Sequence, residues 1–393
     1  MKTMHEDKAK SKQDGLKLAV LESNKIRLTL CNCGAAIFDV EYRMQDGSLR
    51  HIVTGRDTPA AFAENPYNYG ATVGRVANRI KDAELPMEDG ICRLSRNEGK
   101  NHIHGGFTGF SHRIWEMEAG DKKPIPGAAD TVHTAHTADP AYPAHTTDPA
   151  YPAYPAHTAD LMCAENTADR AGSVLFTLVS PDGEEGYPGT LHASVRYTLT
   201  GGEILIEYTA CADRDTVYSP TNHAYWCLGG QGTGIRDEIL SIPAGRYVEV
   251  DDELIPTGRL KETEGTVFDF RTPCRLGDRL DAVLAEPRAK RGFDICYALD
   301  PGNAGLAARL EDPGSGLKLE VESSFPGIQL YTGNFLDDRE GRNGVYFGPH
   351  MGVALECCAF PDTVHHKAFG SVRLRAGETW KRYIRYRIGE VGE

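Results

Sequence analysis

Four side chains outside the low-complexity part of the chain are candidates for acid–base chemistry: His104, His223, Asp294 and Glu356. Glu356 directly follows the apolar run at residues 353–355. We therefore expect it near the end of a buried strand, where a carboxylate needs a specific reason to be charged. Its structural alternative is an internal salt bridge with an arginine. A carboxylate with an imidazole suits two kinds of chemistry: a glycosidase pair, Asp294 with Glu356, or proton transfer on a small sugar by a carboxylate and a histidine.

His223 lies in residues 219–226, which hold one imidazole, one amide, hydroxyls and two large aromatic side chains. Pro220 disfavours a helix here. A sugar-binding surface needs an aromatic face and fixed polar groups, and Tyr225 and Trp226 could supply that face. The alternative is a strand end with a satisfied histidine, because a single histidine is weak support for a site.

Residues 70–80 are punctuated by Gly70 and Gly74, which permit close backbone approach. The stretch lacks both phosphate-loop signatures, GxGxxG and a Gly-Lys-Ser/Thr ending. Its arginines, Arg75 and Arg79, and the amide of Asn78 could hydrogen-bond ligand oxygens in a fixed geometry. Equally, the stretch could be a core-lining strand whose arginines are salt-bridged to carboxylates.

The His102-Ile103-His104 pattern could suggest a metal, because alternate residues of a strand face the same way. No third ligand stands nearby in the sequence, and zinc sites need three or four. We therefore predict no metal. Of the two histidines, His104 directly precedes Gly105-Gly106, where little side-chain bulk would block a ligand.

Composition narrows the possible partners. The 393 residues carry a formal net charge of −13, from 43 lysines and arginines against 56 aspartates and glutamates, which argues against nucleic acid and anionic membrane surfaces. No signal-peptide core and no run of 18 apolar residues is present. The 10 cysteines form no CxxC pair, so we interpret them as reduced thiols and predict a cytoplasmic protein.

The chain has one segment of different character. A nine-residue repeat at 136–144 and 145–153 is rich in Pro, Ala, Thr and His, so we predict a disordered insertion over residues 122–171. Residues 1–16 are predicted to be a disordered tail. Strand-like patterns occur on both sides of the repeat, which favours a single interrupted domain over residues 17–390.

Short strands dominate the rest of the chain. Apolar residues alternate with polar ones, and Gly201-Gly202 between two such runs predicts a hairpin. Helical spacing is confined to residues 276–284. The fold class predicted is therefore all-β, a large antiparallel β-sandwich with few short helices. The clearest alternating runs are residues 26–30, 191–199, 318–323 and 384–388.

Several ordered motifs resemble the aldose 1-epimerase (galactose mutarotase) family across about residues 18–390, apart from the insertion. They are residues 70–80, His104-Gly105-Gly106, residues 180–189, Thr221-Asn222-His223, Thr332-Gly333-Asn334, and Leu355-Glu356 with Phe360-Pro361-Asp362. The resemblance implies the supersandwich β fold of that family. It also implies a cofactor-free interconversion of the α and β anomers of free hexoses such as D-galactose and D-glucose.

The resemblance further implies roles for individual residues. Glu356 matches the general base that takes the proton of the anomeric hydroxyl, and His223 matches the general acid that protonates the ring oxygen. The matching sugar-binding residues are Asn78, Arg79, His104, Asp294 and Gln329. With His223 given this role, we interpret Tyr225 and Trp226 as core packing beneath it.

The sequence departs from the family pattern at two places. Ile295-Cys296 replaces the usual His-Asn after Asp294, and Cys357-Cys358 replaces the usual Thr-Gln after Glu356. Neither change removes an assigned acid or base, but both could reshape the pocket and alter sugar preference.

Competing hypotheses remain besides the glycosidase. One is a hexose-6-phosphate 1-epimerase, which would need a basic cluster at the pocket. Another is a non-catalytic sugar-binding β-sandwich, which the presence of both Glu356 and His223 argues against. The partner expected is a small sugar, bound by a monomer or homodimer.

Overall fold

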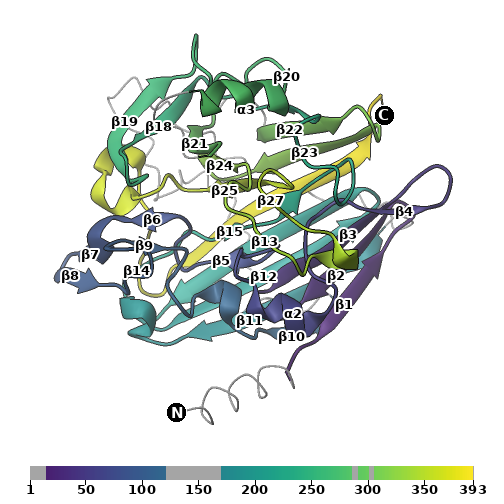
Figure 1. Cartoon of the computed structure of the whole chain (residues 1–393). Coiled ribbons are helices and arrows are strands. Elements are labelled where there is room, and N and C mark those ends of the chain that lie inside the picture. Colours follow the sequence, from purple (N-terminus) through teal and green to yellow (C-terminus); the bar gives the residue numbers. More distant parts are fainter. Residues whose placement is uncertain (1–14, 121–169, 286–290, 301–304, 393) are drawn as a thin grey trace, which may run out of the picture.

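The computed structural model describes residues 15–120, 170–285, 291–300 and 305–392. The predicted tail at 1–16 and insertion at 122–171 lie almost wholly outside this part of the chain. The described residues form mostly antiparallel strands, with α2 (Pro59–Glu64) and α3 (Leu276–Leu284) as their α-helices (Figure 1). This confirms the predicted antiparallel β fold. None of the described helices is both long and apolar enough to cross a membrane.

The largest sheet in the described chain has nine strands and follows directly from the alternating runs of the sequence. Thr200 pairs with Glu203, so Gly201-Gly202 forms the predicted hairpin between two long strands. In spatial order the strands are β10 (Glu116–Ala119), β11 (Arg170–Ser180), β12 (Leu191–Thr200), β13 (Glu203–Ala212), β27 (Thr379–Glu390), β23 (Leu317–Ser323), β22 (Leu306–Asp312), β17 (Ile239–Ser241) and β20 (Cys274–Arg275).

A second sheet, of six strands among the described residues, is the one that positions the candidate chemistry. Its order is β16 (Tyr225–Trp226), β25 (Val353–Cys358), β24 (Gly327–Tyr331), β21 (Asp294–Ala298), β18 (Arg246–Val250) and β19 (Pro256–Glu262). In Figure 1 its green strands lie above the long teal strands and the yellow β27 of the larger sheet.

Smaller sheets and helical turns complete the described fold. A four-stranded sheet contains β1 (Leu18–Glu22), β2 (Ile26–Cys31), β3 (Ala36–Arg43) and β4 (Leu49–His51). Paired short strands are β5 (Thr72–Val73) with β15 (Thr221–Asn222), β6 (Arg79–Ile80) with β9 (His102–Ile103), β7 (Glu84–Met87) with β8 (Gly90–Arg93), and β14 (Thr216–Val217) with β26 (Arg373–Leu374). The 3-10 turns are Lys81–Ala83, Phe110–His112, Glu184–Gly186, Arg342–Gly344, Thr363–His365 and Lys367–Phe369.

The period-two alternation of β25 divides its side chains between core and site. Leu355 and Cys357 belong to the main hydrophobic core, whereas Glu356 points to the opposite face of the sheet. Trp226 is fully buried in the same core, with its ring centroid 4.8 Å from that of Tyr386 on β27. One face of the six-stranded sheet therefore packs inward, and its other face is left for the candidate site.

The helix α3 was predicted from its apolar spacing, whereas α2 was not. The side chain of Thr58 caps α2 by accepting a hydrogen bond from the Ala61 amide at 3.2 Å, and Pro59 occupies the first turn. Thr-Pro is a recognised helix start, but six residues are too few to show a helical period.

Candidate active site

His223 lies between β15 and β16 in the chain and is held in place by backbone hydrogen bonds to residues 70 and 71. Its amide donates to the carbonyl of Ala71 at 2.9 Å, and its carbonyl accepts from the amide of Gly70 at 3.0 Å. The neighbouring Asn222 donates from Nδ2 to the Gly70 carbonyl at 2.7 Å. These hydrogen bonds join the stretch at 219–226 to the glycine-punctuated stretch at 70–80. The two sequence motifs therefore lie side by side in the fold.

Glu356 lies opposite Gln329 in the β24–β25 register, within the strand and not at its end as expected. It is buried, and its nearest titratable partner is His223, with Nε2 and Oε1 3.5 Å apart, and not an arginine. The imidazole and carboxyl predicted to act together are therefore brought together, although 133 positions separate them in the printed sequence numbering.

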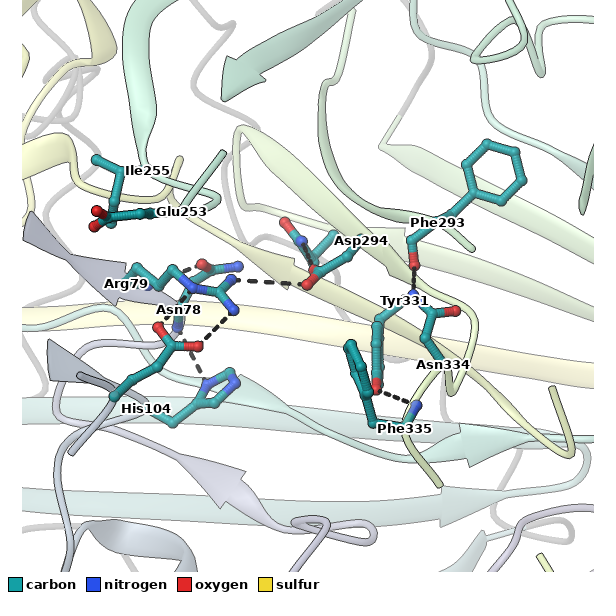
Figure 2. Close-up of polar contacts among 12 residues, drawn as sticks. Asn78, Arg79, His104, Glu253, Ile255, Phe293, Asp294, Tyr331, Asn334 and Phe335 are labelled. Carbon is teal, nitrogen blue, oxygen red and sulfur yellow. Dashed lines mark hydrogen bonds and ion pairs between the residues drawn. The ribbon is translucent and has the colours of Figure 1, made fainter. Parts of the chain in front are cut away.

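Asp294 and Gln329 form the next part of the site, on β21 and β24. Gln329 donates from Nε2 to Asp294 Oδ1 at 2.6 Å, and Asp294 Oδ2 lies 3.8 Å from Nη1 of Arg79 (Figure 2). The Oε1 atom of Gln329 is buried and has no hydrogen-bond partner among the described residues. Gln329 is not itself part of the cavity lining, so its direct contact with a ligand stays a prediction.

Arg79 occupies β6, whose partner strand β9 carries Ile103 opposite it. Its guanidinium is bonded to Glu98 in a bidentate manner, from Nε to Oε2 at 2.8 Å and from Nη2 to Oε1 at 2.7 Å. Burial lowers the pKa of Arg79, but the charges of Asp294 and Glu98 outweigh burial and leave the pKa raised. Arg79 is thus a fixed cation that forms the salt bridge considered from the sequence, and its contact with a ligand stays a prediction.

His104 is positioned by an unusual backbone conformation, with φ of 52°. The following Gly105 packs so closely on Gly74 that a Cβ atom would lie 1.7 Å from the Gly74 carbonyl oxygen, which explains the glycine. The Asn78 amide donates to His104 Nδ1 at 3.2 Å (Figure 2), so the proton of the neutral imidazole is on Nε2. Burial, with the charges of His223 and Arg79, holds the pKa of His104 well below its usual value.

Arg75, the other arginine of the motif, has a structural role instead. Its guanidinium donates to the Ser180 hydroxyl at 2.9 Å, to the Ser180 and Pro181 carbonyls at 3.0 Å each, and to the Pro188 carbonyl at 2.9 Å. Arg75 is buried and does not line the cavity. The stretch at 70–80 therefore places Arg79 at the cavity and fixes residues 180–188 through Arg75.

These side chains line a cavity with a volume of about 240 Å³. Most of the predicted site residues line it, and Gln329 reaches it through Asp294. Sequence reasoning missed several lining residues because they come from loops without a motif. The lining comprises Pro66, Tyr67, Asn68, Asn78, Arg79, Glu98, Ile103, His104, His223, Tyr225, Asp294, Tyr331, Phe335 and Glu356.

The two aromatic residues after His223 and the cysteines that depart from the family pattern lie at different places relative to the cavity. Tyr225 packs in a buried hydrophobic cluster, as expected, and also lines the cavity, with its ring centroid 4.9 Å from that of His223; Trp226 packs in the main core. Consecutive residues of a strand face opposite ways, and this could have separated the two. The departures at Cys296 and Cys358 are buried and do not line the cavity, so they do not contact a ligand there directly.

Burial sets the protonation of the central pair. Burial raises the pKa of Glu356 to about 8; the charge of Asp294 raises it further and Arg79 opposes the shift. Burial also lowers the pKa of His223 to about 4. Between about pH 4 and pH 8 the pair holds one proton, which burial keeps on the carboxyl.

The same residues could hold a metal ion. One ligand atom each from His104, His223 and Glu356 lie within 4.8 Å of one another. His223 and Glu356, which are distant in the sequence, thus supply the further ligand atoms that His104 would need. His102 takes no part, because its ring is hydrogen-bonded to the Ser95 carbonyl and the Tyr187 hydroxyl. The fixed positive charge of Arg79 acts on both His104 and Glu356 and opposes a cation. The absence of a metal remains a prediction.

The chain is similar to known proteins in both sequence and structure. A model of the family described as aldose 1-epimerase matches residues 17–147 and 163–387. Galactose mutarotase of Bos taurus is 33% identical, over 92% of each chain, and aldose 1-epimerase of Haemophilus influenzae is 30% identical, over 93% of each. The crystal structure of a GalM/aldose epimerase homologue from C. elegans superposes with a TM-score of 0.77 at 25% identity, covering 96% of this chain and 100% of that one.

Proposed function

The chain belongs to the aldose 1-epimerase family, and we propose that His223 and Glu356 perform its reaction on free hexoses such as D-galactose and D-glucose. The protein is an isomerase that interconverts sugar anomers. The observation that carries the residue roles is the 3.5 Å approach of His223 Nε2 to Glu356 Oε1 inside the cavity. A buried acid and base at this separation can act on two oxygen atoms bonded to one carbon.

The reaction needs two proton transfers in each direction. The Glu356 carboxylate takes the proton of the C1 hydroxyl, and His223 gives a proton to the ring oxygen. The bond between C1 and the ring oxygen breaks, and an open-chain aldehyde forms. After rotation about the C1–C2 bond the same transfers run backwards, with His223 as base and Glu356 as acid, and the ring closes with inverted C1.

The single proton shared by Glu356 and His223 is consistent with this cycle. The open-chain stage requires a protonated Glu356 and a neutral His223, which is the state that burial favours. Ring opening starts from the other arrangement of the same single proton. Sugar hydroxyls that donate to the Glu356 carboxylate lower its pKa and shift the proton to His223.

The remaining polar groups are proposed to hold the sugar hydroxyls. Arg79 Nη1 and His104 Nε2 supply donors, and Asp294 Oδ2 and Gln329 Oε1 supply acceptors, with Asn78 beside them. The 3.8 Å gap between Arg79 Nη1 and Asp294 Oδ2 suits a hydroxyl that accepts from one and donates to the other. Tyr225 contributes an aromatic surface next to His223.

Polarimetry on freshly dissolved α-D-galactose tests the proposal. The purified protein should accelerate the approach to anomeric equilibrium, and D-glucose should be tested beside it. Absence of acceleration would overturn the assignment of substrate. Unchanged activity in both Glu356→Gln and His223→Asn, with the fold intact, would overturn the residue roles and leave the sugar assignment standing.

The wider setting is also proposed. We infer one domain over residues 17–390, interrupted at 122–171, a small sugar as the partner, and a monomer or homodimer without nucleic acid or membrane. A cytoplasmic location is supported by the free state of the nine cysteines that the structure describes, because reducing compartments keep thiols free. Size-exclusion chromatography and cell fractionation test these points.

A further inference from the structure

Glu98 lines the cavity but has no part in the proton transfers. Its backbone forms a tight turn with Asn101, through hydrogen bonds of 2.9 and 3.2 Å. The preceding Asn97 clamps this turn to β9, with its side chain bonded to the Ile103 amide and carbonyl at 2.8 Å each. Because β9 pairs with β6, Glu98 and Arg79 stand on one connected piece of backbone.

Glu98 occupies the side of Arg79 that arginines use to bind anionic ligands. The bidentate geometry, with Nε and Nη2 both bonded at 2.7–2.8 Å, is the one by which a guanidinium recognises a carboxylate or phosphate. In this chain a protein side chain already fills that position. The remaining nitrogen, Nη1, faces Asp294 across 3.8 Å, where a neutral hydroxyl can both accept and donate.

The charged side chains around the cavity also disfavour an anionic ligand. Arg79 is the sole basic side chain with a permanent charge among the described lining residues, and the carboxylates of Glu98 and Asp294 oppose it. The two lining histidines have lowered pKa values and are neutral near pH 7. An anionic group that enters the cavity therefore meets an excess of negative charge at short range, where it is poorly screened.

We propose that Glu98 determines specificity by occupying the guanidinium of Arg79, so that the site accepts neutral aldoses and rejects aldoses bearing a carboxylate or phosphate. This inference rests on the proposed function, because it names the substrate class of the same site. It also accounts for the site lacking the basic cluster that a hexose-6-phosphate 1-epimerase would need.

The test compares two sugars that differ at C6, D-galactose and D-galacturonate, with the neutral methyl ester of galacturonic acid as a control for size. The rate of anomer exchange is followed by NMR, and the ratio of kcat/KM for galactose to that for galacturonate is measured for each protein. Because the ratio is taken within one preparation, a partly unfolded variant does not distort it.

Three variants give the decisive comparison. Glu98→Gln should lower the ratio by at least about tenfold, mainly through KM for galacturonate, since one charged hydrogen-bond partner of Arg79 is released. Glu98→Asp, which keeps the charge, should retain most of the discrimination. Glu253→Gln removes a nearby carboxylate that pairs with Lys100 at 3.2 Å outside the cavity lining, and it should leave the ratio unchanged.

Each outcome has one meaning. The inference is overturned if Glu98→Gln keeps the wild-type ratio, if Glu253→Gln lowers it equally, or if the wild-type protein turns over galacturonate as well as galactose. A gain for the methyl ester equal to that for galacturonate would assign the effect to size and also overturn it. A wild-type protein inactive on galactose is a different result, because it contradicts the proposed function itself.

Discussion

His223 and Glu356 approach each other beside the pairing of β16 with β25. Tyr225 pairs with Ala354 and Trp226 with Val353, and His223 precedes the first of these pairs by two residues while Glu356 follows it by two. Their Nε2 and Oε1 atoms are 3.5 Å apart. The strand pairing, together with the backbone hydrogen bonds that tie His223 to residues 70 and 71, therefore fixes the distance between the proposed acid and base.

Removal of either member of the pair should abolish most activity. Glu356→Gln and His223→Asn should each lower kcat by roughly two to four orders of magnitude, the contribution of one positioned acid or base. Polarimetry measures the loss, and circular dichroism checks the fold. The double variant should be little worse than either single variant, because the two residues act as a unit in the same ring-opening step. Simple multiplication of the two effects would argue for independent roles.

The pH dependence should report the shared proton. With the pKa of His223 lowered to about 4 and that of Glu356 raised to about 8, the free enzyme holds one proton on the pair between these pH values. We expect kcat/KM to be flat over that range and to fall about tenfold per pH unit above and below it. An acidic limb near pH 6.5, the pKa of an ordinary histidine, would contradict the buried neutral imidazole.

Two buried carboxyls should make stability depend on pH in the same direction. Burial raises the pKa of Glu356 and of Glu238 to about 8 each, so the folded state holds both protons more tightly than the unfolded chain does. This stability is fully present below the unfolded pKa of about 4.5 and is lost as the pH rises through about 8. Each carboxyl should cost about 1–4 kcal/mol of unfolding free energy by pH 8.5.

The matched variants Glu356→Gln and Glu238→Gln separate stability from function. Both should stabilise the protein relative to wild type in urea unfolding, by more at pH 8.5 than at pH 5. Glu238 lies outside the cavity lining and accepts a hydrogen bond from the Leu228 amide at 2.5 Å, so its variant should retain activity while Glu356→Gln loses it. A stability gain independent of pH would mean that the carboxyls do not titrate as inferred.

Arg75 and Arg79 should respond differently to replacement by methionine. Arg75 satisfies buried carbonyls at 180–188, so Arg75→Met should lower the unfolding free energy by about 1–3 kcal/mol for each carbonyl left unsatisfied, with little change in kcat/KM per folded molecule. Arg79→Met should mainly raise KM. Urea unfolding and polarimetry on the same samples distinguish the two, and a reversed pattern would contradict the division of roles.

The sequence predicts elements that show a local pattern, and it does not predict contacts that arise only from the three-dimensional arrangement of the chain. Long strands such as β12 were predictable because alternation is local, whereas α2 and the paired short strand β6 have too few residues to show a period. The pairing of His223 with Glu356 was predicted by residue type and resemblance, and the structure brings the two side chains together. Glu98 could not be found, because it has no motif and reaches Arg79 through the pairing of β6 with β9.

Deletion of the repeat should leave activity nearly unchanged. The strands that flank it, β10 and β11, pair with each other, and the Gly120 amide donates to the Ser173 carbonyl at 2.9 Å. The chain therefore leaves and re-enters the sheet at one place, which a short turn can close, and loop-closure entropy depends weakly on length. Removal of residues 124–169 should keep kcat/KM within about threefold and should not lower the unfolding free energy, because the shorter loop costs less to close. A large loss of activity with an intact fold would show that the repeat takes part in function, and polarimetry with urea unfolding on the deleted protein decides between these outcomes.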